Sequence, residues 1–199
     1  MQDVNVYIKT TARGPAKRKT VYFVYSGEVM LYNLTKHGNR KVIFILGKGR
    51  LLNQSIVSKK PNALFCEAAC PVQVIEIAEK QFLQLMEQSH ALTRSVLREY
   101  ERNLWRMGHQ LKNTTGNMQM ERKIAAKLWK LGRDFGVDTE DGVMIDIDLT
   151  ITLMADLVGA PRENVSRACK VLTDRGLICY GNKRFILIDF DGLAEFYKM

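Results

Sequence analysis

The segment that most constrains the fold runs from position 149 to 188, where helical spacing of apolar residues occurs twice and two strand-like runs follow. Thr150 is a suitable N-cap for a first helix, and Gly159-Ala160-Pro161 can end that helix and begin another. Gly176 ends the second helix, and the runs around Gly181-Asn182-Lys183 predict a short hairpin. The predicted inward-facing residues are Leu153, Leu157 and Val158 on the first helix, and Val165, Ala168, Cys169 and Leu172 on the second.

Two helices joined by a short glycine-containing turn form a helix-turn-helix, whose second helix can enter the major groove of DNA. Arg167 has a planar fork that pairs with guanine O6 and N7, Glu163 can accept from cytosine N4, and Ser166 can reach a base edge or a phosphate. The alternative is a helical hairpin whose exposed face is merely charged. The predicted DNA-binding residues, from the second helix and the hairpin, are Arg162, Glu163, Ser166, Arg167, Lys170, Lys183 and Arg184.

The stretch VGAPRENVSRACKVLTDRGLI resembles the winged-helix motif of the CRP/FNR superfamily of bacterial transcription regulators. Glu163, Ser166 and Arg167 match the E-x-x-S-R variant of that motif, which is similar to the fumarate-and-nitrate-regulator branch rather than the cyclic-AMP branch. The resemblance implies double-stranded DNA as the partner and TTGAT-like half-sites as the sequence that is read. Activation of transcription would also require contacts with RNA polymerase, for which the sequence shows no motif.

The net positive charge of the chain lies in its N-terminal half and not in the predicted DNA-binding half. The formal net charge is +9, but residues 1–112 carry 18 lysines and arginines against 8 acidic residues, and residues 113–199 carry 12 against 13. The DNA prediction therefore depends on the motif and not on bulk charge. No apolar run approaches the roughly 18–20 residues that span a bilayer, and the N-terminus lacks a signal pattern. We expect a cytoplasmic protein without a membrane partner, and reduced cysteines.

Residues 4–8 and 21–78 have the pattern of an all-β domain of the sandwich or jelly-roll type, with short strands separated by turn residues. The order V-Y-F-V-x-S-G-E-V, G-x-G and A-x-C-P-V-x-V-I-E-I resembles the cyclic-nucleotide-binding β-roll, which is the sensor domain of the same superfamily. The expected fold is α+β. It comprises a β-roll at 1–80, a dimerisation helix at 81–113 and a winged-helix domain at 114–199.

The sequence departs from the sensor pattern in two places. It starts later than the family does, so we expect a first β layer that is incomplete or rebuilt. Gln54 and Asn62 occupy the positions at which cyclic-nucleotide binders place a glutamate for the ribose and an arginine for the phosphate. Without the arginine, the phosphate loses a charge-assisted bidentate pair. We therefore expect an effector other than cyclic AMP or GMP, or no effector; the sequence does not identify one.

Residues 79–112 are expected to form one helix with a heptad seam. The seam positions recur at alternating spacings of four and three and are mostly apolar: Met86, His90, Thr93, Leu97, Tyr100, Leu104, Met107 and Leu111. Such a seam most simply packs on a second copy, which predicts a homodimer; the alternative is a helix packed on its own β domain. The predicted dimerisation residues are Leu97, Tyr100, Leu104, Met107 and Leu111. The off-seam arginines are expected to form a solvated face: Arg94, Arg98, Arg102 and Arg106.

Thr114-Thr115-Gly116-Asn117 is the expected hinge. We expect a further helix after it that ends at Gly136, a strand at VMIDI and a final short helix at GLAEFYKM. The inward side of the helix after the hinge is predicted to hold Ile124, Leu128, Leu131 and Phe135.

The sequence lacks the motifs that are typical of enzymes and metalloproteins. There is no N-terminal cysteine cluster, no P-loop and no nucleophile-base arrangement, so we expect no enzyme activity, no cofactor and no metal. Cys66, Cys70, Cys169 and Cys179 are expected to be buried and reduced, with a thiol switch at Cys66 and Cys70 as the alternative. The competing functional hypothesis is an interaction protein, or a thiol-sensing regulator, that keeps this fold but has lost effector binding.

Overall fold

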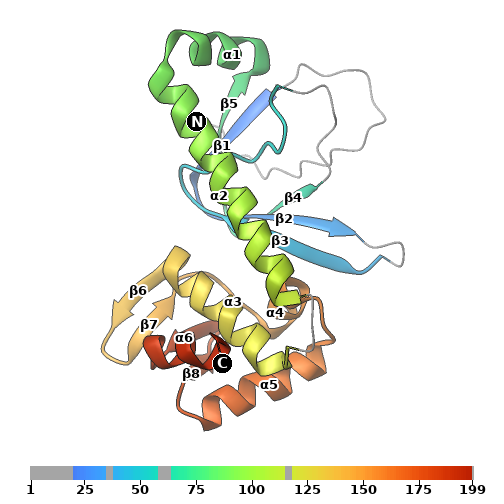
Figure 1. The fold of residues 1–199 in the computed structure, drawn as a ribbon, viewed down its shortest axis with the longest axis vertical. Helices are drawn as coiled ribbons and strands as arrows, with labels where there is room; N and C mark the ends of the chain where they lie inside the picture. The colour runs from blue at the N-terminus through green and yellow to red at the C-terminus, as the bar shows by residue number, and fades with distance from the viewer. Residues whose placement is uncertain (1–19, 35–37, 58–63, 115–117, 199) are drawn as a thin grey trace. The chain divides into compact units, whose positions relative to one another are not determined.

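The computed structural model describes residues 20–34, 38–57, 64–114 and 118–198, which form two compact units, Met1–Met107 and Gly108–Met199. Figure 1 shows strands and two helices in the first unit and a mixture of helices and short strands in the second. The α+β architecture is therefore confirmed. The strand expected at 4–8 and the side chain of Asn62 lie outside the described residues.

The first unit is built from two small antiparallel sheets. β1 (Thr20–Ser26) pairs with β5 (Gln73–Ala78), and β2 (Val29–Leu34) lies between β3 (Arg40–Leu46) and β4 (Phe65–Ala68). Gly27 separates β1 from β2 and adopts a positive φ of 79°. A residue with a side chain adopts this backbone conformation only with strain.

Two hydrophobic clusters hold this unit together. The first joins both sheets through residues that include Val24, Leu31 and Phe44. The second joins β1 to the following helices, because Val21 packs with Phe82 and Val96. The alternating inward residues of the strands thus find their partners across the sheets and on the helices.

The single helix expected over residues 79–112 is wrong: the chain forms two helices, α1 (Glu79–Gln88) and α2 (His90–Thr114). Ser89 between them is extended, with φ −131° and ψ 99°. Its side-chain oxygen accepts from the backbone N–H of Leu92 at 3.2 Å, and its carbonyl accepts from that of Thr93 at 3.0 Å. Serine therefore acts as the N-cap of α2, a role in which its hydroxyl replaces the missing helical acceptor.

The second unit is a helical domain with one four-stranded sheet. Its elements are α3 (Met120–Phe135), β6 (Gly136–Thr139), β7 (Gly142–Ile145), α4 (Ile151–Val158), α5 (Arg162–Asp174), β8 (Ile178–Gly181), β9 (Arg184–Leu187) and α6 (Phe190–Lys198). The strand order is β6-β7-β9-β8, all antiparallel. The expected helices at α3 and α6 are confirmed, whereas β6 was not predicted, because its four residues are all exposed and show no alternation.

On α3, Ile124, Leu128 and Leu131 are buried as expected, and Phe135 is half-buried. No helix among the described residues is long and apolar enough to cross a membrane. The same part of the chain contains no group of three or more His, Cys, Asp or Glu side chains placed to hold a metal ion.

Candidate nucleic-acid interface

The helix-turn-helix has the boundaries that the sequence predicts. The Thr150 hydroxyl accepts from the backbone N–H of Leu153 at 3.0 Å and so caps the start of α4. Gly159 ends α4 in the left-handed conformation, with φ 74° and ψ 48°, and its N–H donates to the Ala155 carbonyl. Pro161 then directly precedes α5.

The buried face of α4 differs slightly from the expected one. It is centred on Met154, Ala155 and Leu157, while Leu153 and Val158 are half-buried. The reason is that α4 packs against both α3 and α5, so its buried side includes Met154 and Ala155 beside the predicted Leu157.

The second helix, α5, divides cleanly into a buried and an exposed face. Val165, Ala168, Cys169 and Leu172 are all buried, as predicted. From Arg162 to Lys170 the exposed side chains of α5 are all polar or charged, namely Arg162, Glu163, Ser166, Arg167 and Lys170. Burial of one face orients the other, so these side chains project from a helix that is fixed by its packing.

Glu163 and Arg167 lie four residues apart, and therefore about one helical turn apart on the same exposed face. The Arg167 guanidinium does not extend freely, because its Nη2 donates to the Oδ1 of Asn164, three residues before it. Asn164 was not among the predicted site residues. It restricts the guanidinium of Arg167 to a smaller set of positions above the helix.

The hairpin after α5 is a two-residue turn. Gly181 pairs with Arg184, and the intervening Asn182 and Lys183 have φ values of 50° and 60°. Two successive positive φ values are typical of a type I′ turn, which matches the twist of the strands. The hairpin is connected to α4, since the backbone N–H of Leu149 donates to the carbonyl of Lys183 at 2.7 Å.

The two basic residues of this hairpin have different surroundings. Lys183 is exposed, whereas the Arg184 guanidinium forms ion pairs with Asp146 through Nη1 and with Asp148 through Nη2, the latter at 3.5 Å. Neither aspartate was among the predicted site residues. Their alternation in the sequence IDID does indicate two side chains on one side of an extended segment.

The geometry agrees with comparisons to known proteins. Residues 122–196 match the family model of the Crp-like helix-turn-helix domain, and residues 13–89 match that of the cyclic nucleotide-binding domain. The global nitrogen regulator of Nostoc sp. is 25% identical over 173 residues, which cover 85% of this chain and 76% of that protein. A CRP-like cAMP-activated global transcriptional regulator of Mycobacterium tuberculosis is 23% identical over 176 residues, 88% of this chain and 78% of that protein.

This chain belongs to the CRP/FNR superfamily of transcription regulators. Solved structures show the same fold. FixK2 from Bradyrhizobium japonicum has a TM-score of 0.75 at 19% identity and covers 89% of this chain and 87% of its own. A CRP/FNR-family regulator from Thermus thermophilus has a TM-score of 0.74 at 22% identity, with 94% and 90% covered. The relatives are named as transcription regulators, in agreement with the expectation that this CRP/FNR-superfamily chain is not an enzyme.

In the first unit of this CRP/FNR-superfamily protein, the side chain of Gln54 forms a hydrogen bond with the backbone. Its Oε1 accepts from the backbone N–H of Leu64 at 3.1 Å. Nearby, the Arg50 Nε lies 3.1 Å from the Glu99 carboxylate of α2, with both side chains at least 85% covered. The Gln54 amide therefore bonds the backbone directly before β4, and a largely buried ion pair joins the segment after β3 to α2.

Large apolar side chains remain exposed along α2, at positions other than those that pack on the sheets of the first unit. They are Leu97 at 56% exposure, Leu104 at 72%, Trp105 at 57%, Met107 at 46% and Leu111 at 60%. Tyr100, predicted on the same seam, packs beside the second hydrophobic cluster of the first unit, and its hydroxyl donates to the Asn53 carbonyl at 3.3 Å. Burial, assisted by the neighbouring Glu99 carboxylate, raises the pKa of Tyr100 to about 12.

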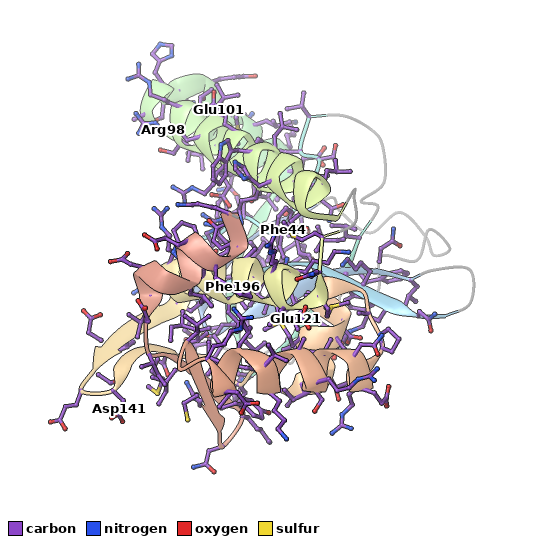
Figure 2. The ribbon with its side chains drawn as sticks, turned by 60° about the horizontal axis from the view of Figure 1, so that its bottom comes forward. Phe44, Arg98, Glu101, Glu121, Asp141 and Phe196 are labelled. Atoms are coloured by element: carbon purple, nitrogen blue, oxygen red, sulfur yellow. The ribbon has the colours of Figure 1, made fainter. Side chains whose placement is uncertain are left out.

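The arginine stripe of α2 is only partly a solvated face. Arg94, Arg98 and Arg102 are exposed, and Arg98 projects outward from the helix in Figure 2. The expectation is wrong for Arg106, which is 8% exposed and stacks over the Phe44 ring at 5.1 Å. The aromatic face attracts the guanidinium, and the apolar stem of the arginine covers the sheet.

The cysteines have three different environments. Burial raises the pKa of the Cys66 and Cys169 thiols to about 11. Cys70 is half-buried, and its Sγ donates to the Glu28 carboxylate at 2.8 Å. Cys179 is exposed, so its predicted core position is wrong; β8 lies at the edge of its sheet, where alternate side chains face solvent. A Cys66 thiol with so high a pKa is a poor nucleophile at neutral pH.

Proposed function

We propose that this CRP/FNR-superfamily regulator acts as a homodimer that reads a palindromic DNA site with the α5 helices of its two protomers. The observation that carries the proposal is the division of α5. One face is buried in the core of the second unit, and the other presents Glu163, Ser166 and Arg167 to solvent near the start of the helix. The first turns of a recognition helix are the part that reaches base edges in the major groove.

The side chains on this face suggest which bases they read. The Arg167 guanidinium can pair bidentately with guanine, and the Glu163 carboxylate can accept from the amino group of the cytosine paired with it. Both groups lie on one face and are one turn apart. Together with the E-x-x-S-R spacing, this supports TTGAT-like half-sites, in which each half contains one G·C pair. Arg162, Lys170 and Lys183 are exposed cations around these residues and are suited to phosphates.

The dimer is supported by the exposed apolar residues of α2. Leu97, Leu104 and Leu111 are each seven residues apart, and each is more than half exposed. A helix surface of this kind gains free energy when it packs on a second helix with the same heptad pattern. Two recognition helices related by a two-fold axis would enter successive major grooves, which lie about 34–36 Å apart, and would read a palindromic site.

For the effector, we infer a molecule other than a cyclic nucleotide. Gln54 supplies a neutral amide at the position where the resemblance implies a carboxylate for ribose, and that amide already bonds the Leu64 N–H. The sequence has Asn62 at the position of the phosphate-binding arginine, and an asparagine cannot neutralise a phosphate. A regulator of chromosomal genes would work in the cytoplasm, where RNA polymerase is a further candidate partner.

The proposal is tested by selection of randomised duplexes on the purified full chain at moderate salt, without added ligand. We expect a palindrome with TTGAT-like halves to be enriched. Arg167→Ala should cost about 1–3 kcal/mol on the selected site and relax one position in each half. A uniform loss on all duplexes would instead assign Arg167 to a phosphate. No enrichment with the wild-type chain, either alone or with cell extract added, would refute the proposed DNA-reading function.

A further inference from the structure

The Arg184 side chain is bound by two carboxylates that come from a distant part of the chain. Asp146 and Asp148 follow β7, and 38 residues separate Asp146 from Arg184 in the sequence. Arg184 Nη1 pairs with Asp146, and its Nη2 lies 3.5 Å from Asp148. With one cation and two anions, this cluster carries a net charge of −1. Its arginine nevertheless belongs to the hairpin that would face DNA under the proposed function.

Lys183, the neighbouring cation in the same turn, is exposed and is not held by carboxylates: it forms no ion pair with any residue that the structure describes. Its backbone carbonyl accepts from the Leu149 N–H at 2.7 Å, so the turn is held against the segment that carries both aspartates. Lys183 and Arg184 therefore have equal charge and adjacent positions but different availability to a phosphate.

Folding stability does not account for the cluster. The side chains of Arg184, Asp146 and Asp148 are 33%, 56% and 59% exposed, and ion pairs as exposed as these contribute little to stability. DNA binding is more sensitive to them, because the affinity for any duplex, whatever its sequence, depends on how many phosphates the protein cations neutralise. To reach a phosphate, Arg184 would have to leave two carboxylates unpaired beside the DNA, where like charges repel.

We propose that Asp146 and Asp148 withhold Arg184 from the DNA backbone and thereby lower the sequence-independent part of DNA affinity. Lys183 is then the phosphate contact of the hairpin. A weaker contribution from the backbone leaves a larger share of the binding free energy to the base contacts of α5, which improves discrimination between sites. This inference rests on the proposed function, and it assigns Arg184 a different role from the DNA contact that its sequence position predicts.

The test compares the salt dependence of binding to two duplexes by fluorescence anisotropy, using the full chain. One duplex carries two inverted TTGAT-like halves, and the other has the same length and composition in scrambled order. Lys183→Ala is the matched control for Arg184→Ala, since each removes one cation from the same turn. For a dimer, loss of one phosphate contact per protomer should flatten the slope of log K against log salt by about 1.8.

We expect this flattening for K183A and less than half of it for R184A. The double variant D146N/D148N should steepen the slope by a similar amount and tighten binding to the scrambled duplex at least about fivefold, because Arg184 becomes available to a phosphate. Adding R184A to that double variant should remove the gain. Thermal unfolding should be nearly unchanged in all of these variants, because the substituted side chains are exposed.

Two results would overturn the inference alone: an R184A slope as flat as that of K183A, or a D146N/D148N variant that binds the scrambled duplex no more tightly than the wild type. The wild-type chain provides the reference for the proposed function. If it does not distinguish the two duplexes, and Arg167→Ala has no effect on either, the DNA-reading function fails and the inference fails with it.

Discussion

Leu104 is the most exposed of the apolar residues on α2, and its truncation tests the dimer directly. It is 72% exposed in the single chain. Complete burial of a leucine side chain contributes about 1.5–3 kcal/mol, so burial of the exposed part in a dimer would contribute about 1–2 kcal/mol per protomer. Because alanine keeps the β-carbon and each dimer contains two copies, Leu104→Ala should cost about 2–3 kcal/mol, roughly a 30- to 150-fold weaker dimer.

The assay is sedimentation equilibrium over a dilution series of the full chain, with the dimer dissociation constant as the measured quantity. Leu85→Ala is the matched control, since Leu85 is 41% exposed on α1 and lies off the seam. Leu104→Ala should change the stability of the monomer little, because the Leu104 side chain is 72% exposed in the single chain. The reasoning is refuted if Leu104→Ala and Leu85→Ala change the dissociation constant equally, or if the wild-type chain stays monomeric at every concentration.

Three further predictions concern the turns between strands of the first unit, the buried thiols and the α5 helix. Gly27→Ala should lower the free energy of unfolding in urea by about 2–4 kcal/mol, and Gly38→Ala should lower it by only about 1–2 kcal/mol. Both glycines have a φ of 79°, but only a β-carbon at position 27 would lie 2.4 Å from a carbonyl oxygen. Equal losses would contradict this prediction. Between pH 9.0 and about 11, the Cys66 and Cys169 thiols stay protonated in the folded chain but ionise in the unfolded chain. The free energy of unfolding should therefore fall as the pH rises through this range. Replacing both cysteines by alanine should make that fall smaller. Glu163→Ala should relax the preference at its C·G pair by about 1–3 kcal/mol in the duplex selection, and an unchanged preference would remove that role.

The sequence by itself determined those features that depend on a few neighbouring residues. The cap at Thr150, the left-handed Gly159 and the turn at Asn182-Lys183 are local preferences of side chain and backbone, and the structure has all of them. The buried stripe of α5 follows from helical spacing in the same way. The helix-turn-helix could therefore be predicted, together with the outward set that includes Glu163 and Arg167.

Tertiary structure decided those features that depend on contacts between distant segments. Arg106 has the spacing of a solvated arginine stripe, but the Phe44 ring on β3 provides a site that buries it. Tyr100 has the spacing of a dimer seam, but it packs on the hydrophobic cluster between β1 and the helices, and its hydroxyl bonds the Asn53 carbonyl. Periodicity says which residues share a helix face. It does not say how far the neighbouring sheet extends along that face.

The hairpin shows the same limit at the candidate site. Arg184 and Lys183 are equivalent in sequence, as adjacent cations in a predicted turn. Only the antiparallel pairing of β7 with β9 brings Asp146 and Asp148 beside Arg184 and leaves Lys183 exposed. The charge that DNA would meet there depends on a contact across 38 residues, and no local pattern contains that information.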